Sequence, residues 1–226
     1  MLHPSIHTLS IGLPKEMNSQ LVDQSIVTGI QKQPVKAVDL TYDGFEGDGV
    51  GNTKNHGGRD RAISFYPFEH YQMWEEEFDL SLTAPAFGEN VTVTNLLERD
   101  VYIGDIYTIG SATVQISQGR VPCNTIDRKL NVNGVFARFI ETRYSGFFAR
   151  VLQPGCIKEG DTLELMERTV NSPSVWMCSD VYFKREDFAK IQSMLELKSL
   201  SHEWKIRYRK ILRSSPKGGS EDVSSG

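Results

Sequence analysis

Short strand-like runs joined by glycine-rich segments fill the chain up to about residue 168, and they limit the folds available to it. The clearest run covers residues 112–117, in which Ala112, Val114 and Ile116 alternate with polar residues. Because few regular helices separate the runs, the pattern favours a mixed α/β, β-rich fold with a barrel-like core over an alternating parallel sheet. The other strands are predicted within residues 22–39 and at 62–66, 91–93, 101–109, 147–152 and 162–166.

Apolar stripes with helical spacing interrupt this β-rich part in a few places. Aromatic residues recur every three or four positions within residues 68–78, directly after Pro67. Proline suits the first turn of a helix, so we expect the strand to stop before Pro67 and a helix to begin there. A shorter stripe at residues 135–140 predicts a further helix.

The character of the sequence changes near residue 171. Apolar residues then follow three short helical patterns, the third of which starts at about Ser201, a residue type that suits a helix N-cap. The final stretch of small and charged residues has almost nothing to bury and is predicted to be disordered. We therefore expect a first domain at residues 1–170, with its core at about 25–168, a three-helix module at 171–213 and a disordered tail at 214–226.

Composition narrows the class of protein further. The chain has 226 residues, of which 39% are hydrophobic, and a net charge of −4, so it can build a real core and has no overall attraction to nucleic acid. No apolar run approaches the length needed to cross a membrane, and the N-terminus lacks the order of a secretory signal. Three widely spaced cysteines suggest neither a disulfide framework nor a paired zinc site. These features favour a reducing cytoplasm and no membrane contact.

Cys123 is the first candidate for chemistry. It closes a stretch that begins at Ser117 and follows the alternating strand, with Arg120 nearby and Pro122 restricting the backbone. A thiol held near a positive charge favours the thiolate, which is the form that attacks electrophiles and binds metals. A buried and inert cysteine is the alternative interpretation.

Residues 47–61 form a second candidate, rich in both glycine and basic side chains. Closely spaced glycines, among them Gly57 and Gly58, allow the backbone to approach a ligand. Planar arginine side chains and free backbone N–H groups suit phosphate or another oxyanion. The segment therefore predicts an anion site, with a solvated loop as the alternative. Its candidate donors are Lys54, His56, Arg59 and Arg61.

Familiar motifs do not account for this segment. Its glycines fit neither a dinucleotide-binding fingerprint nor a phosphate loop, and a calcium-like start at Asp39 lacks the required Glu at its twelfth position. A third segment, Phe-Gly-Glu-Asn ending at Asn90, precedes a strand. Asn90 offers both a donor and an acceptor to a heterocycle, although it could equally fix a turn.

The predicted third helix near the C-terminus is basic, with Lys205, Arg207, Arg209, Lys210 and Arg213. Such a charge run suggests contact between domains or plain solvation as readily as nucleic-acid binding. Nucleic acid is therefore not an expected partner.

The order of these segments resembles the MOSC domain, named after the C-terminal part of molybdenum cofactor sulfurase. The resemblance covers most of residues 25–168, and the helical tail is similar to the three-helix module of a bacterial subgroup that includes proteins giving resistance to 6-N-hydroxylaminopurine. The matching motifs are His-Gly-Gly-x-Asp-Arg (56–61), Phe-Gly-Glu-Asn (87–90), Gly-Asp (104–105), Arg-x-Pro-Cys (120–123) and Pro-Gly…Gly-Asp (154–161).

The resemblance implies a MOSC-type β-barrel core that carries molybdenum cofactor (molybdopterin), and an oxidoreductase that reduces N-hydroxylated bases or related compounds. Cys123 matches the cysteine that ligates molybdenum in such reductases. A separate electron-donor protein is implied, because the chain has no recognisable flavin, haem or iron–sulfur motif. Pyridoxal phosphate binding is a further family-level possibility. The residues implied to bind the cofactor are Lys54, His56, Gly57, Gly58, Arg59, Arg61, Asn90, Ser117 and Arg120.

Other functions stay open at this stage. The same nucleophilic cysteine would serve a sulfur carrier or transferase that holds a persulfide on Cys123. A non-catalytic cofactor-binding or interaction module, with the helical tail docking a partner, is the third alternative.

Overall fold

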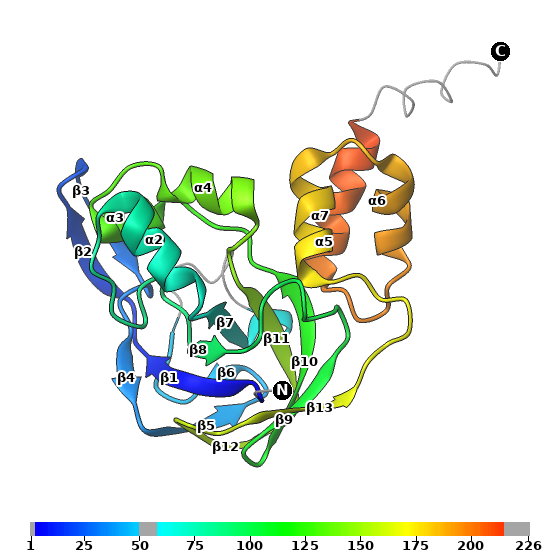
Figure 1. The fold of residues 1–226 in the computed structure, drawn as a ribbon, viewed down its shortest axis with the longest axis horizontal. Helices are drawn as coiled ribbons and strands as arrows, with labels where there is room; N and C mark the ends of the chain where they lie inside the picture. Colours follow the sequence, from blue (N-terminus) through cyan, green and yellow to red (C-terminus); the bar gives the residue numbers. More distant parts are fainter. Residues whose placement is uncertain (1–2, 50–57, 215–226) are drawn as a thin grey trace.

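The computed structural model of the chain describes residues 3–49 and 58–214, and Figure 1 shows a curved β-sheet with helices packed around it. Within these residues the main sheet has eight strands in the order β13-β9-β10-β11-β7-β8-β1-β4. All neighbours are antiparallel except β7 and β8, which are parallel. The strands are β1 (Ser5–Ile11), β4 (Gln33–Val35), β7 (Ile63–Pro67), β8 (Val91–Thr94), β9 (Ile106–Ile109), β10 (Ala112–Gly119), β11 (Phe147–Gln153) and β13 (Leu163–Glu167).

The main sheet curls so that the start of β1 meets the residues next to β13, at the far end of the strand order. Ser5 at the start of β1 forms an isolated bridge with Thr162, next to β13. The Ile6 N–H donates to the Asp161 carbonyl at 2.9 Å, and the Gly160 N–H donates back to the Ile6 carbonyl at 3.0 Å. These bonds join strands that lie far apart in the sheet order, so the predicted barrel-like core is confirmed as a curled half-barrel.

Smaller sheets extend the half-barrel at its rim. One contains β12 (Gly155–Lys158), β5 (Ala37–Thr41) and β6 (Gly44–Phe45), and the other pairs β2 (Lys15–Ser19) with β3 (Val22–Thr28). Helices α2 (His70–Phe78), α3 (Thr125–Leu130) and α4 (Val135–Thr142) lie together beside β2 and β3 (Figure 1). Their apolar faces bury Trp74 and Phe139 against Tyr66 and Phe87. This cluster holds the rim strands and α3 in place.

The C-terminal helices α5 (Val175–Lys184), α6 (Phe188–Leu195) and α7 (His202–Arg213) form a bundle at the other end of the molecule (Figure 1). The Ser201 side chain accepts from the Trp204 N–H, which confirms the predicted N-cap. Trp204 and Cys178 share one hydrophobic cluster with the barrel strands, so the bundle is packed onto the barrel. A Cβ on Gly119 would lie 2.6 Å from the Ser179 Oγ, so only glycine allows this close approach to β10.

Most predicted strands and helices are confirmed, and the differences have local causes. Pro67 is the last residue of β7, where it pairs with Val93, and it is not the first residue of the helix. The strand can include this proline because the Phe68 N–H donates the next hydrogen bond, to the Val93 carbonyl. Helix α2 begins only at His70. Residues 101–105 form a turn, since the Asp105 carboxylate accepts the Tyr102 N–H.

Strands β1, β2, β6 and β12 and helix α3 were not predicted. Strand β12 begins at Gly155, which the sequence suggested was part of a turn between strands. A Cβ there would meet the Ser111 backbone at 2.5 Å, so this glycine serves close packing. Helix α3 follows Cys123 directly and is short enough to escape a search for periodicity.

Candidate functional site

A cavity of about 470 Å³ opens between the curled sheet, the rim strands and the C-terminal bundle. Its walls come from β3 and the loop after it, β6 and the residues that follow, the end of β10, α3 and α7. Ligand sites in proteins commonly have volumes of this order. Of the described residues in its walls, Lys32, Arg61, Arg120, Arg128 and Arg207 are cationic, against the acidic Asp43, Asp48 and Glu203. The cavity therefore favours an anion.

Cys123 lies in this cavity, in the short connection between β10 and α3. It is half-buried and not part of a disulfide. The Ile126 N–H donates to the Cys123 carbonyl at 3.2 Å, so the first turn of α3 fixes the backbone that carries the thiol. The thiol makes no hydrogen bond to any residue within 3–49 or 58–214. It is held in position but left open for a reaction or for a metal.

Arg120 enters the same cavity from the end of β10. Its Nη2 donates to the Phe87 carbonyl at 2.7 Å, which fixes the guanidinium against the Phe-Gly-Glu-Asn segment. Its Nη1 is buried and has no hydrogen-bond partner among the described residues. Burying a charged donor without a partner costs free energy, so this atom is a strong candidate to contact a bound anion.

Gln118 and Arg128 complete this side of the cavity, and neither was predicted. The Gln118 Oε1 is buried and finds no hydrogen-bond partner in residues 3–49 and 58–214, and the residue is 2% exposed. The Arg128 side chain lines the cavity and forms no ion pair with the described part of the chain. Thr125 and Arg128 are three residues apart on α3, a spacing that places both on one helix face. That spacing is the local signal that could have identified Arg128. We call Gln118, Arg120, Cys123 and Arg128 the open wall.

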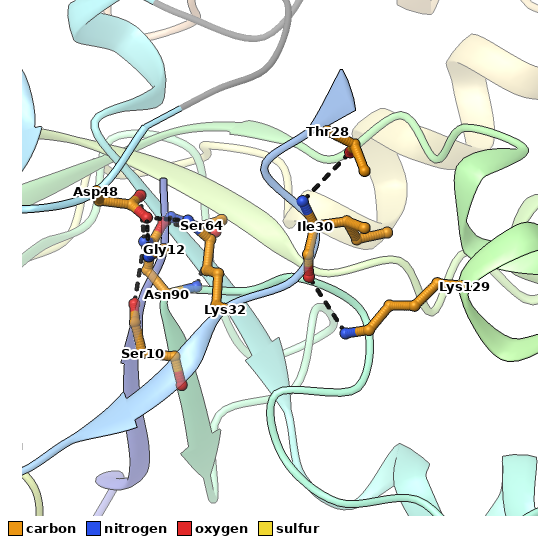
Figure 2. A network of polar contacts seen from close by, with 9 residues as sticks. All are labelled: Ser10, Gly12, Thr28, Ile30, Lys32, Asp48, Ser64, Asn90 and Lys129. Atoms are coloured by element: carbon orange, nitrogen blue, oxygen red, sulfur yellow. Dashed lines mark hydrogen bonds and ion pairs between the residues drawn. The ribbon is translucent and has the colours of Figure 1, made fainter. Parts of the chain in front are cut away.

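Another part of the cavity lining, which we call the closed wall, is a polar network of Lys32, Asp48, Ser64 and Asn90 (Figure 2). Asp48 accepts from the Lys32 ammonium, from the Asn90 Nδ2 at 2.8 Å and from the Gly12 N–H at 2.8 Å. The Asn90 Oδ1 accepts from the Ser64 hydroxyl at 2.8 Å and from the Ser64 N–H at 3.2 Å. Burial lowers the pKa of Lys32, and the charge of Asp48 opposes this change.

The closed wall assigns Asn90 a structural role. Its amide group donates to Asp48 and to the Ser10 carbonyl, and it accepts from Ser64, so its bonding capacity is used within the protein (Figure 2). Asn90 still faces the cavity. Glu89, its neighbour in the Phe-Gly-Glu-Asn motif, is fully buried and accepts from the Tyr71 and Thr92 hydroxyls. This motif joins β8 to the sheet around it.

The glycine-rich segment separates into residues that reach the cavity and residues that do not. Gly58 and Arg61 line it, whereas Arg59 is exposed and pairs with Asp43 at 3.1 Å. The predicted donors Lys54 and His56, together with Gly57, lie outside the described residues. Ser117 does not line the cavity either. It is fully buried, and its hydroxyl donates to the Asp60 and Phe148 carbonyls.

Arg61 connects the cavity to the C-terminal bundle. Its Nη1 lies 2.7 Å from the Glu203 Oε2 on α7. Burial lowers the pKa of Arg61, Glu203 raises it and the nearby Arg207 lowers it. Glu203 and Arg207 also line the cavity, although the sequence suggested no part in the site for this helix beyond domain contact or solvation. No local signal links them to Arg61, because the contact depends on how the bundle packs.

The remaining cysteines differ from Cys123. Cys178 is buried in the bundle, and burial raises the pKa of its thiol to about 12. Cys156 is half-buried in β12. No group of three or more His, Cys, Asp or Glu side chains that could hold a metal ion occurs among the described residues. Nor does any described helix have the length and apolar character to cross a membrane.

This arrangement defines a class of β-rich proteins in which a strand end delivers a cysteine into a cationic cavity. The chain belongs to the MOSC family: residues 52–164 match the MOSC domain. The resemblance inferred from the motifs is thereby confirmed, and the match spans both Cys123 and the glycine-rich segment.

Relatives extend the match to nearly the whole chain. The chain is 38% identical over 204 residues to the uncharacterized protein YflK of Bacillus subtilis, a match that covers 89% of this chain and 92% of that protein. It is 34% identical over 168 residues to protein YiiM of Escherichia coli, covering 73% and 75% of the two chains. A protein of Gibberella moniliformis named reductase is 35% identical over 124 residues, which are 51% of this chain and 21% of that protein.

A solved structure shares the fold, including the C-terminal helices. The crystal structure of YiiM from Geobacillus stearothermophilus matches with a TM-score of 0.78 at 34% identity, covering 92% of this chain and 99% of that chain. The mixed, β-rich architecture with C-terminal helices is therefore shared with YiiM.

Proposed function

We propose that the protein is a cytoplasmic molybdenum-cofactor-dependent oxidoreductase that reduces N-hydroxylated bases or related N-hydroxylated compounds. The observation that carries the proposal is the open wall. There the half-buried Cys123 thiol shares a cavity with a buried guanidinium nitrogen of Arg120, and neither has a hydrogen-bond partner among the described residues. Membership of the MOSC family supports the cofactor, and the relative named reductase supports the class of reaction.

The open wall fits the cofactor in three respects. Cys123 offers a soft thiolate, the type of ligand that suits molybdenum. The Arg120 Nη1 and Arg128 offer positive charge to an anionic phosphate. The Gln118 Oε1 offers a buried acceptor to the N–H groups of a pterin ring. Because the described residues hold no cluster of metal-ligating side chains, the other metal ligands must come from the cofactor.

When bound, the cofactor supplies the two-electron chemistry that converts R–NHOH, two electrons and two protons into R–NH₂ and water. The residues of the chain would hold and orient the reacting groups. Arg120, fixed by the Phe87 carbonyl, would fix the anionic end of the cofactor, and Cys123 would fix the metal. The closed wall would offer the cofactor few free polar groups, because its own groups are bonded to one another. The electrons would come from a separate donor protein.

Metal analysis of purified protein tests the ligand. We expect Cys123→Ala, purified from cells that make the cofactor, to lose most of the molybdenum and pterin carried by the wild type, while its thermal midpoint changes little. Cys156→Ala is the matched control and should retain both. Equal molybdenum content in the wild type and Cys123→Ala would overturn the assignment.

The open thiol also suits a second function, a sulfur carrier in which Cys123 holds a persulfide. Incubation with a cysteine desulfurase and cysteine, followed by mass spectrometry, separates the two functions. The carrier function requires a gain of one sulfur atom on Cys123. Absence of that gain, together with bound molybdenum, favours the reductase.

A further inference from the structure

A second hollow of about 540 Å³ lies at the seam between the barrel and the C-terminal bundle. Its walls come from η1 (Arg59–Arg61), the end of α5 and the exposed side of α7. Arg61, Glu203 and Arg207 line both this hollow and the cavity that contains Cys123. The two spaces therefore share these side chains as a common boundary. We call the second space the seam hollow.

The boundary between the two spaces carries more positive than negative charge. Arg61 and Arg207 both face the carboxylate of Glu203, with N–O distances of 2.7 Å for each arginine. The Arg207 Nη1 donates to the Tyr182 hydroxyl at 3.0 Å, which fixes the guanidinium. The Glu203 carboxylate pairs with both partly buried guanidinium groups, and the charge of Asp60 also acts on Arg61. Among the described residues that line the seam hollow, Arg61, Arg185, Arg207 and Lys210 are cationic and Glu203 is acidic, so the hollow as a whole favours an anion.

Further cations surround this boundary. Arg185, His202 and Lys210 line the seam hollow, and the Arg185 guanidinium lies 5.7 Å from the centre of the Tyr182 ring. The bundle as a whole is basic, since residues 171–214 carry nine Lys or Arg and five Asp or Glu, whereas the whole chain carries 25 and 29. The positive charge is thus concentrated where the bundle faces the cavity.

We propose that the seam hollow binds a phosphate monoester, so that the substrates of this site are N-hydroxylated nucleotides, recognised through their 5′-phosphate as well as their base. This inference rests on the proposed function for the position of the base near Cys123. A phosphate monoester carries a charge of about −1.5 to −2 at neutral pH and accepts forked hydrogen bonds from arginine. Arg120, Gln118 and Arg128 stay available for the cofactor, because they lie on the open wall and not in the seam hollow.

Binding measurements on the full chain, purified with its cofactor, test the inference. Adenosine 5′-monophosphate and adenosine serve as probes, because they differ only in the phosphate and lack the reducible group. By calorimetry, we expect the monophosphate to bind at least about tenfold more tightly, the size expected for one or more charge-assisted hydrogen bonds. The preference should weaken as salt is added.

Two double variants with the same charge change locate the site. Arg185→Gln with Lys210→Gln should remove most of the preference and leave adenosine binding unchanged. Lys190→Gln with Arg209→Gln, on α6 and α7 but outside both cavities, should keep it. All four side chains are exposed, so neither double variant disturbs the core.

Each contrary outcome has a distinct meaning. Equal affinity for the two probes in the wild type overturns the inference. Loss of molybdenum and pterin in Arg185→Gln with Lys210→Gln would show that the seam hollow holds the phosphate of the cofactor, which also overturns it. An unchanged monophosphate preference in this double variant, together with slower reduction by the electron-donor protein, would also overturn the inference. It would show that the seam hollow is a docking surface for the donor protein. None of these results depends on Cys123→Ala, which tests the proposed function separately.

Discussion

The two walls line the same cavity and are both polar, yet they differ in how their polar groups are bonded. On the closed wall, Lys32, Asp48, Ser64 and Asn90 use their hydrogen-bonding groups on one another and on nearby backbone atoms (Figure 2). On the open wall, buried atoms of Gln118 and Arg120 have no hydrogen-bond partner within the part of the chain that the structure describes. A folded protein rarely leaves such groups unpaired. The difference separates polar residues that maintain the fold from those that are complementary to a molecule the chain does not supply.

Breaking the closed wall should have the largest effect on stability. Asp48→Asn removes the counter-ion of the buried Lys32, and we expect a loss of about 3–5 kcal/mol in the free energy of unfolding, measured with urea. Adding Lys32→Met should restore much of the loss, because no buried charge would then lack a partner. A loss below about 1 kcal/mol for Asp48→Asn would show that the closed wall does not maintain the fold.

The hydrogen bonds of Lys129, which join α3 to two nearby loops, should make the stability of the protein depend on pH. The Lys129 ammonium on α3 donates to the Ile30 carbonyl at 3.2 Å and to the Pro85 carbonyl at 2.7 Å, as Figure 2 shows for Ile30. Burial lowers its pKa to about 8; the charge of Glu89 raises the pKa, and those of Arg120 and Lys32 lower it. Below pH 8 both the folded and the unfolded states are charged, and folding carries the cost of a buried charge. As the pH rises from 8 towards 10.5, only the unfolded state keeps the proton, so stability rises.

We therefore expect the wild type to gain up to about 3 kcal/mol relative to Lys129→Met between pH 7.5 and 10.5, in parallel urea titrations. The variant corrects for other groups that titrate in this range. If the difference between the two proteins stays constant with pH, the pKa of Lys129 is the same in the folded and unfolded states, and burial of its charge carries no cost.

The open wall should behave in the opposite way, with little effect on stability and a clear effect on the cofactor. Arg128→Gln should change the free energy of unfolding by no more than about 0.5 kcal/mol, because its side chain has no ion pair to lose among the described residues. Its molybdenum content should fall roughly tenfold, from the loss of one charge-assisted contact. Arg209→Gln is the control with the same charge change. A marked loss of stability without loss of molybdenum would place Arg128 among the structural residues.

Arg59 should give the smallest effect. It belongs to the same motif as Arg61, but it is exposed and pairs with the exposed Asp43. Such pairs contribute between about 0 and 1 kcal/mol. Arg59→Gln should therefore leave the thermal midpoint and the molybdenum content close to those of the wild type. A large loss of cofactor in this variant would show that Arg59 acts in the site despite its position.

These contrasts also show which features the sequence could reveal. Alternation predicted β10 well, and the cysteine at its end was found because a strand end and a positive neighbour are local features. The closed wall was missed because Lys32, Asp48 and Asn90 are far apart in the chain and meet only after the sheet curls. Arg59 and Arg61 looked alike, since a tight turn decides which of them faces the cavity. Arg128 alone carried a local signal that was overlooked.

The contacts of Asp60 have a consequence for the order in which the protein is synthesised and folds. Its carboxylate accepts from the Arg150 guanidinium at 2.9 Å and from the His202 N–H at 3.0 Å, at the start of α7. During synthesis on the ribosome, every barrel strand is made before α7. Asp60 can therefore accept from the His202 N–H only after the last helix has been translated. The wall formed by Glu203 and Arg207 is absent from the nascent barrel until then. The cavity that these two side chains line is therefore complete only after α7 has been translated.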